Sequence, residues 1–159
     1  SVFADAKRVG FKLENTIVIS RTIEGQYPDY ERVIPKDLPV QIAVKREQLI
    51  NAIRRAIIFS RDSHGKPVSI QVLPDGGMVV STEQSEAGTY REEIDCRVLK
   101  GSGVQIAFNG GYLLETLARI GTDKGLIGLS EPVQPAVFKP MKENGEEGEV
   151  FVLAPLNLG

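Results

Sequence analysis

Apolar and polar residues alternate along the first part of the chain in the pattern of half-buried β-strands. Residues 8–13 and 16–23 both alternate, and polar Glu14 and Asn15 lie between them. A period of two places every second side chain on one face of a strand, and a short polar connection allows two such strands to pair. We therefore predict a β-hairpin near the start of the chain.

The rest of the chain contains an internal repeat. The segment QIAVKREQLINAIRRAI at residues 41–57 aligns with QIAFNGGYLLETLARIG at residues 105–121, so the offset from residue 41 to residue 105 is 64 residues. In each copy a short strand-like run leads into apolar positions at helical spacing, which predicts a helix with one buried face. These positions are Leu49, Ile50, Ile53, Ala56 and Ile57 in the first copy and Leu113, Leu114, Leu117 and Ile120 in the second.

Further strand patterns surround the two predicted helices. Residues 68–73 and 78–83 flank Pro74-Asp75-Gly76-Gly77, a turn sequence that predicts a second hairpin. The predicted elements follow the order strand, helix and three strands, and this order occurs twice. It predicts an α+β domain with two helices on one side of mainly antiparallel sheet. The other predicted strands cover residues 39–44, 90–98, 103–108, 126–129, 137–139 and 150–153.

The charge balance limits the partners that the chain can bind. The 159 residues carry a formal net charge of −2, and the pI is about 5.5. A tight, sequence-specific nucleic-acid binder normally has a clear positive excess, so any contact with DNA should come from a local patch and be weak. No apolar run approaches the roughly 18 to 20 residues of a membrane-spanning helix.

Residue types that support catalysis or metal binding are scarce. Cys96 is the only cysteine, which excludes an internal disulfide and a thiolate metal cluster, fits a reducing cytosol and is interpreted as a small core residue. His64, the only histidine, lies in a polar loop, and no phosphate-binding glycine motif is present. Adjacent Glu92 and Glu93 would point to opposite faces of a strand, and residues 142–149 form an acidic turn. We expect no catalytic site, cofactor or metal.

Hydrogen-bond donors and positive charge gather on the exposed sides of the two predicted helices. An ordinary solvated surface is the alternative interpretation for either helix alone. Two related helices that present donors side by side favour a surface that faces phosphates without reading base sequence. The donors are Lys45, Arg46, Gln48, Asn51, Arg54 and Arg55 in the first copy, Arg61 just beyond its predicted helix, and Asn109, Tyr112, Thr116 and Arg119 in the second copy.

The stretch GQYPDYERVIPK, residues 25–36, separates the first hairpin from the repeat. Pro28 and Pro35 lack an amide hydrogen and disfavour helix in the residues that precede them. A plain turn would seldom contain two tyrosines, a valine and an isoleucine as well. We therefore predict an extended connector, which is either a linker alone or also a binding surface.

Three stretches resemble the bacterial sliding clamp family, the β subunit of DNA polymerase III. RTIEGQYPDYERVIPK is similar to the junction of that family's second and third domains, QIAFNGGYLLETL to its last ring-lining helix, and VFVLAPLNLG to its C-terminal strand and tail. The resemblance implies a DNA-clamp fold, with closing strands of the middle domain and the connector in residues 1–38 and a complete third domain in residues 39–159. The chain begins at Ser1 rather than methionine, and we expect a piece of a longer protein.

The resemblance also implies a function. Three-domain clamp subunits form head-to-tail homodimers around duplex DNA, so the chain would belong to a non-catalytic processivity factor in the bacterial cytoplasm, associated with the nucleoid. Contact with DNA would be weak and independent of sequence, and the chain alone would form no stable ring because the partner face lies in the first domain. The implied DNA-facing residues are Arg55, Arg61, Asn109, Tyr112 and Arg119. Ile58 and Phe59 match the dimer interface, with plain core packing as the alternative.

Clamps of this family bind short peptide motifs of polymerase, clamp-loader and repair proteins in a pocket between their second and third domains. A proline-braced connector beside an apolar strand and tail would make a concave surface for an extended peptide. The implied pocket residues are Pro28, Arg32, Val33, Pro135, Val152, Ala154, Pro155 and Leu156. A stand-alone peptide-binding module that has the clamp fold but does not encircle DNA is the alternative, and an enzyme of unknown class is a third, less favoured interpretation.

Overall fold

The computed structural model describes residues 1–60, 65–83, 88–142 and 148–157. Contacts between residues divide the chain into two compact units, Ser1–Tyr30 and Glu31–Gly159. The connector between the hairpin and the repeat contains one short 3-10 helix, η1 (Tyr30–Arg32). The domain boundary that the sequence predicts between residues 38 and 39 stays a prediction.

The first unit is an antiparallel sheet in the order β1-β2-β3, formed by β1 (Val2–Ala4), β2 (Arg8–Lys12) and β3 (Ile17–Arg21). The predicted hairpin is confirmed, because β2 and β3 pair directly. Gly10 of β2 is buried under the ring of Phe3, and the ring leaves no room for a side chain there. Most apolar side chains of this unit are exposed, and so small a sheet needs a further packed layer for stability.

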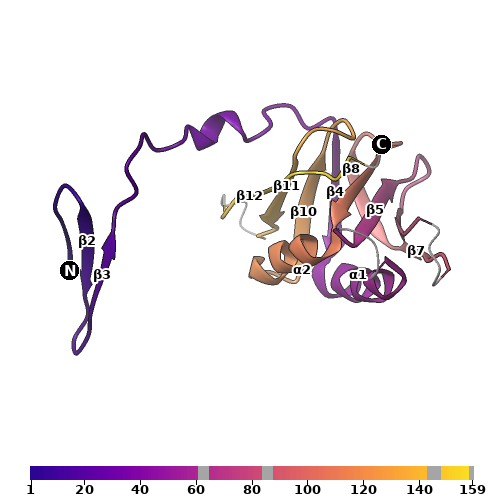
Figure 1. Cartoon of the computed structure of the whole chain (residues 1–159). Helices are drawn as coiled ribbons and strands as arrows, with labels where there is room; N and C mark the ends of the chain where they lie inside the picture. Colours follow the sequence, from indigo (N-terminus) through magenta and orange to yellow (C-terminus); the bar gives the residue numbers. More distant parts are fainter. Residues whose placement is uncertain (61–64, 84–87, 143–147, 158–159) are drawn as a thin grey trace. The chain divides into compact units, whose positions relative to one another are not determined.

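The second unit consists of two antiparallel sheets and two helices that lie side by side against them (Figure 1). The five-stranded sheet has the order β12-β11-β10-β4-β8, and the four-stranded sheet has the order β7-β6-β5-β9. The predicted α+β fold with helices packed on antiparallel sheet is therefore confirmed. The elements are β4 (Val40–Lys45), α1 (Arg46–Ser60), β5 (Pro67–Val72), β6 (Met78–Ser81), β7 (Arg91–Ile94), β8 (Cys96–Lys100), β9 (Gln105–Asn109), α2 (Gly110–Arg119), β10 (Lys124–Leu129), β11 (Ala136–Pro140) and β12 (Phe151–Leu153). In the described part of the chain, neither helix has the length and apolar character needed to cross a membrane.

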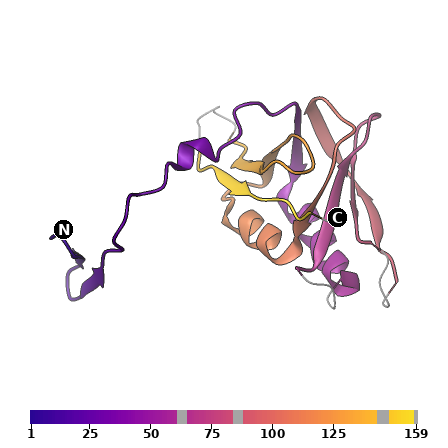
Figure 2. The same ribbon diagram turned by 45° about the horizontal axis from the view of Figure 1, so that its top comes forward.

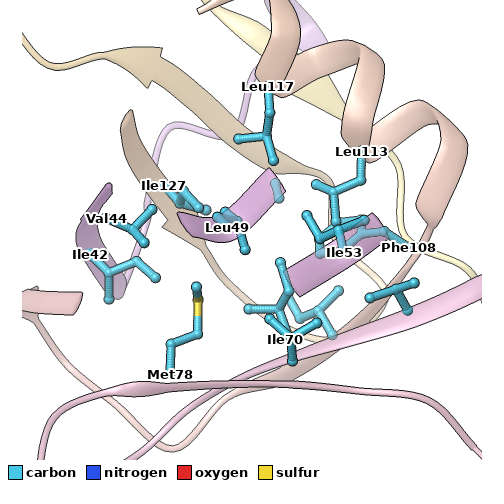
Figure 3. Close-up of a cluster of buried hydrophobic side chains, with 14 of the residues drawn as sticks. Ile42, Val44, Leu49, Ile53, Ile70, Met78, Phe108, Leu113, Leu117 and Ile127 are labelled. Atoms are coloured by element: carbon cyan, nitrogen blue, oxygen red, sulfur yellow. The ribbon is translucent and has the colours of Figure 1, made fainter. Parts of the chain in front are cut away.

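The core lies between the helices and the sheets (Figure 3). Leu49 and Ile53 of α1 and Leu113 and Leu117 of α2 are fully buried, as their helical spacing predicts. Each such side chain contributes about 1.5–3 kcal/mol by leaving water, so the apolar stripes fix the face on which each helix packs. Ala56 and Ile120 are also buried in the core. The other stripe residues, which lie at the margin of the core and are only partly buried, are Ile50, Ile57 and Leu114.

The internal repeat of the sequence is also a repeat in the pairing of strands. The leading strand of the first copy, β4, pairs with β10, which follows the second helix, and Ile42 lies opposite Ile127. The leading strand of the second copy, β9, pairs with β5, which follows the first helix, and Ile106 lies opposite Ile70. Each copy therefore contributes its first strand to the sheet of the other copy, and the two copies share one core.

The second predicted hairpin is confirmed. Strands β5 and β6 pair in an antiparallel register that places Val72 opposite Met78. In the turn between them, Gly76 and Gly77 have φ angles of 90° and 96°, a backbone conformation that glycine adopts without the steric cost of a side chain.

The prediction of a single strand over residues 90–98 is wrong. Asp95 interrupts it, so that β7 pairs with β6 in one sheet and β8 pairs with β4 in the other. The first copy therefore has four strands after its helix, and the segment crosses from one sheet to the next as strands at sheet corners do. Alternation along a chain reports which side chains are buried, but it carries no information about which sheet a strand joins.

Candidate functional site at the C-terminal segment

Residues 154–157, which we call the C-terminal segment, follow β12 and cross to the outer edge of β9 (Figure 2). The amide of Leu156 donates a hydrogen bond of 2.8 Å to the carbonyl of Ala107 in β9. In the first copy, β8 pairs with β4 so that Arg97 lies opposite Ala43. Ala43 and Ala107 are equivalent positions of the repeat, so the C-terminal segment holds the place at β9 that β8 holds at β4.

A pocket of about 200 Å³ lies beside this segment. Of the residues that the sequence assigns to a peptide pocket, Leu156 lines it directly. Val133, in the loop before β11, is 66% exposed, which makes it an apolar side chain available to a ligand. The sequence analysis missed most of the lining because these residues come from three separate loops and strands. The lining residues are Ser69, Gln105, Ala107, Pro132, Val133, Leu156 and Asn157.

The other predicted pocket residues of the second unit lie on the neighbouring strands. Pro135 immediately precedes the pair formed by Ala136 of β11 and Leu153 of β12, and Ala154 immediately follows it, so the structure brings Pro135 and Ala154 together at one end of the strand pair. Val152 and Pro155 are partly buried and Ala154 is exposed.

The connector residues assigned to the pocket fall in both units. Pro28 belongs to the first unit, and Arg32 and Val33 belong to the second. Val33 is exposed, so it is an apolar side chain open to contact. In the first unit, Tyr27 and Tyr30 pack edge to face, with ring centroids 6.3 Å apart.

Asn109 has a structural role that the sequence analysis missed. Its side-chain oxygen accepts hydrogen bonds from the amides of Gly111 at 2.9 Å and Tyr112 at 3.2 Å and caps the N-terminus of α2. Asn109 also lies close to Leu156, because both side chains are within 4 Å of the point where a side chain on Gly65 would begin. The structure therefore brings Asn109 to the C-terminal segment, although the sequence analysis placed the two residues on different surfaces.

Arg55, predicted to face DNA, is held by strand β7. Its guanidinium donates to both carboxylate oxygens of Glu92, with nitrogen–oxygen distances of 2.7 and 3.0 Å, and to the Tyr90 hydroxyl at 3.1 Å. The Tyr90 hydroxyl also donates to Glu92. Hydrogen bonds from Tyr90 and then Arg55 lower the pKa of Glu92, and the bond to Glu92 raises the pKa of Arg55. This contact links α1 to β7 and leaves fewer donors of Arg55 for phosphate.

The two residues assigned to the dimer interface have different surroundings. Ile58 is 61% exposed, which excludes plain core packing for this residue. Phe59 is partly buried and stacks on the ring of Tyr90, with centroids 5.6 Å apart and planes at 28°. At the end of α1, Ile58 is therefore open to contact, whereas Phe59 is engaged with Tyr90 within the chain.

The remaining predicted DNA-facing residues lie on or near the helices. Tyr112 is 60% exposed on the first turn of α2. Arg119 is exposed at the end of α2 and donates to the Glu115 carbonyl at 3.2 Å. Arg61 lies outside the described residues, as do His64 and most of the predicted acidic turn at residues 142–149. Among the described residues, no group of three or more histidine, cysteine, aspartate or glutamate side chains could hold a metal ion.

Comparison with protein families shows a match to one family model. The model described as "DNA polymerase III beta subunit, C-terminal domain" matches residues 31–151. A curated relative named beta sliding clamp, from Staphylococcus aureus, is 26% identical over 155 residues, which cover 98% of this chain and 40% of the relative. The beta sliding clamp of Halalkalibacterium halodurans is 28% identical over 130 residues, which cover 82% of this chain and 34% of the relative.

Solved structures agree with this match. The DNA polymerase III beta chain of Streptococcus pneumoniae superimposes with a TM-score of 0.87 at 27% identity, over 98% of this chain and 41% of that chain. A Pseudomonas aeruginosa sliding clamp crystallised with griselimycin bound gives a TM-score of 0.86 at 25% identity, over 99% of this chain and 41% of that chain. The chain thus spans about two fifths of the length of these relatives.

Proposed function

Because the chain belongs to the family of the DNA polymerase III beta subunit, C-terminal domain, we propose that it forms the C-terminal part of a processivity factor for a replicative DNA polymerase. In this proposal the full-length subunit assembles as a head-to-tail homodimer around duplex DNA in the bacterial cytoplasm, and the chain itself supplies no catalytic group. The match of the family model to residues 31–151 is the single observation that carries the proposal.

The pocket beside the C-terminal segment is the proposed docking site for short peptide motifs of polymerase, clamp-loader and repair proteins. Leu156 and Val133 supply apolar contacts, and Gln105 and Ser69 supply polar groups at the same pocket. A preformed pocket of this composition suits an extended peptide with a glutamine followed by a hydrophobic pair. The connector residues Pro28, Arg32 and Val33 would contribute a further wall in the assembled subunit.

We assign Asn109 to this peptide pocket rather than to the DNA-facing surface. Its side chain lies next to Leu156, and its oxygen is already occupied by the amides that begin α2. The amide nitrogen of Asn109 is then the group that a peptide carbonyl could reach. Tyr112, on the first turn of α2, is exposed and is compatible with either surface.

The exposed arginines of the helices are proposed to face DNA in the assembled ring. Arg119 is open to solvent at the end of α2, and its contact with Glu115 is a weak surface pair that a phosphate could replace. Arg55 would have to leave Glu92 first, so we expect it to contribute less than Arg119. Arg61 stays a proposed DNA contact from sequence alone. Ile58 and Phe59 are proposed to lie at the dimer interface.

A peptide-binding measurement tests the docking site on this chain. A fluorescent peptide with a glutamine followed by two hydrophobic residues should bind the chain weakly, because only part of the proposed pocket is present. Val133→Asp should abolish this binding, whereas Val150→Asp, at another exposed valine that does not line the pocket, should leave it unchanged. Undiminished binding by Val133→Asp would show that the peptide binds elsewhere.

Retention on circular DNA separates the two candidate functions. A full-length subunit that forms a ring should stay on closed circular DNA and slide off when the circle is cut, and a stand-alone peptide-binding module should do neither. In sedimentation, the 159-residue chain alone should not form a ring-shaped dimer. A closed, DNA-retaining dimer of this chain would contradict that expectation.

A further inference from the structure

The side chains that hold α1 against β7 lie on one face of the β7 segment. Tyr90, just before β7, and Glu92 and Ile94 within it are alternate residues, so they share the face that packs on α1. Ile94 is buried in the core and Glu92 is partly buried, whereas Arg91 and Glu93 on the other face are exposed. Tyr90 and Glu92 are therefore presented together to the helix.

Two side chains of α1, one helical turn apart, meet this face. The planar guanidinium of Arg55 donates to both carboxylate oxygens of Glu92 and, from its Nε, to the Tyr90 hydroxyl at 3.1 Å. The ring of Phe59 stacks on the ring of Tyr90. A two-pronged contact of this kind fixes the direction of the arginine side chain as well as its distance. The contacts therefore hold the C-terminal part of α1 in one orientation relative to β7.

Tyr90 is itself fixed to the sheet by its backbone. Its amide donates to the Thr82 hydroxyl at 3.1 Å, and its carbonyl accepts from the Thr82 amide at 3.0 Å. Thr82 directly follows β6 and is buried. Because the sheet side of the network is anchored in this way, breaking the network should release the end of α1 rather than move β7.

Ile58 lies in the turn of α1 that this network restrains. It follows Arg55 by three residues and is therefore its neighbour on the helix surface. Its side chain is 61% exposed and open to contact. The last four carbonyl groups of a helix have no partner within the helix, and residues 57–60 of the described helix include no basic side chain to bind them. The orientation of Ile58 therefore depends on the contacts that Arg55 and Phe59 make with the β7 segment.

We propose that Arg55 is a positioning residue for subunit association. It holds Glu92 and Tyr90, and so presents Ile58 to the partner subunit in a single orientation. The role rests on the proposed function, in which Ile58 lies at the dimer interface. An interface whose side chains are ordered before association loses less conformational entropy on binding. In this role Arg55 stays with Glu92 in the assembled ring instead of leaving it to contact DNA.

Dissociation of the full-length dimer tests the proposal. Arg55→Gln and Glu92→Gln should each raise the dissociation constant at least about fivefold, because loss of either partner breaks the two-pronged contact. The double variant should dissociate hardly more than either single variant, since the two side chains act as a unit. Analytical ultracentrifugation over a concentration series would measure all four proteins. If Arg55 instead contacted DNA, Glu92→Gln would free it for phosphate and leave dimerisation unchanged.

Arg55→Lys separates the geometry of the side chain from its charge. A lysine keeps the positive charge but lacks the planar fork that holds Glu92 and Tyr90 together. It should therefore raise the dissociation constant nearly as much as Arg55→Gln. Tyr90→Phe keeps the ring that stacks on Phe59 and removes only the hydroxyl, so its effect should be smaller.

Val40→Ala is the control for a general loss of stability. Val40 is buried in β4 of the five-stranded sheet, whereas β7 belongs to the four-stranded sheet. The substitution should lower the free energy of unfolding by leaving a cavity, but it should not change the dissociation constant. Circular dichroism and urea unfolding of the full-length variants would confirm that each is folded and would rank their stabilities.

Four results would overturn the proposal. Normal dimerisation by Arg55→Lys, together with weaker retention on circular DNA by Arg55→Gln, would make Arg55 a DNA contact. A rise in the dissociation constant for Val40→Ala as large as that for Arg55→Lys would mean that stability alone sets dimerisation. Normal dimerisation by both Arg55→Gln and Glu92→Gln would remove the positioning role alone, whereas a monomeric natural subunit would overturn the proposed function with it.

Discussion

The two copies of the repeat differ in how their sheet edges are completed. In the first copy, β8 extends over five residues and pairs with β4 from Gln41 to Val44, with one register shift between Gln41 and Ile42, so that the edge of β4 is covered by a strand. In the second copy the equivalent edge of β9 receives the C-terminal segment, whose Leu156 amide bonds to Ala107. Pro155 has no amide hydrogen and cannot add a further donor beside it. The irregular edge is where the pocket at Leu156 lies, which suggests that an incomplete strand pairing can make room for a ligand.

The largest expected effect tests whether the two copies share one core. Ile53→Ala in α1 and Leu117→Ala in α2 should each lower the free energy of unfolding by about 2–5 kcal/mol, because both side chains are fully buried in the same cluster. Urea unfolding followed by circular dichroism would measure both. Two separate transitions, with one variant affecting only one of them, would show that the copies unfold independently.

The next largest effect compares the two sheet edges directly. Leu156→Asp should weaken binding of the glutamine-containing peptide by about tenfold or more, which corresponds to about 1.4 kcal/mol, because it places a charge in the apolar part of the pocket. Arg97→Asp, at the equivalent place in the first copy, should leave this binding unchanged. Fluorescence anisotropy would measure both affinities. Equal losses in the two variants would mean that the peptide does not distinguish the two edges.

A smaller effect is expected at the N-terminus of α2, which is capped by Asn109, the last residue of β9. The first helix, α1, follows Lys45 of β4, whose side chain has no acceptor for such a cap. Asn109→Ala should lower the free energy of unfolding by about 1 kcal/mol, because it removes the acceptor for the amides of Gly111 and Tyr112. Asn109→Asp keeps an acceptor at the same place and should preserve stability while removing the amide donor. If Asn109 also contacts the peptide, Asn109→Asp should still weaken peptide binding. Normal peptide binding by this stable variant would restrict Asn109 to the cap.

The smallest expected effect concerns the ion pair between Arg55 of α1 and Glu92 of β7. In the described part of the chain, α2 forms no ion pair of this kind with a strand. The pKa of Glu92 is lower in the folded chain, so its stabilising contribution is present at neutral pH and is lost as the pH falls through the folded pKa. Glu92→Gln should therefore be slightly less stable than the natural sequence at about pH 7, and this difference should shrink as the pH falls through the folded pKa of Glu92.

Glu93→Gln is the matched control for the previous comparison. Glu93 is on the same strand and forms an exposed pair with Arg91 at 3.6 Å, which should contribute little. Urea midpoints measured at several pH values would compare the two variants. A difference between Glu92→Gln and the natural sequence that does not change with pH would rule out the carboxylate of Glu92 as its source.

The sequence predicted local features well and long-range ones incompletely. The buried faces at Leu49 and Leu113 and the two hairpins follow from spacing and turn residues, and all are confirmed. Residues 90–98 looked like one strand because alternation continues across Asp95. The proximity of Asn109 and Leu156 could not be read from spacing, because the two residues meet only when the C-terminal segment crosses to β9.

The amino-acid sequence alone thus determined the two helices, the repeat, the hairpins and the family resemblance. These depend on residues close in the chain or on motifs that can be compared directly. Only the tertiary structure decided which sheet each strand joins, that Arg55 is bound to Glu92, and that Asn109 lies beside the C-terminal segment. The physical reason is that these contacts join residues far apart in sequence, and packing of the shared core selects among the many pairings that local patterns allow.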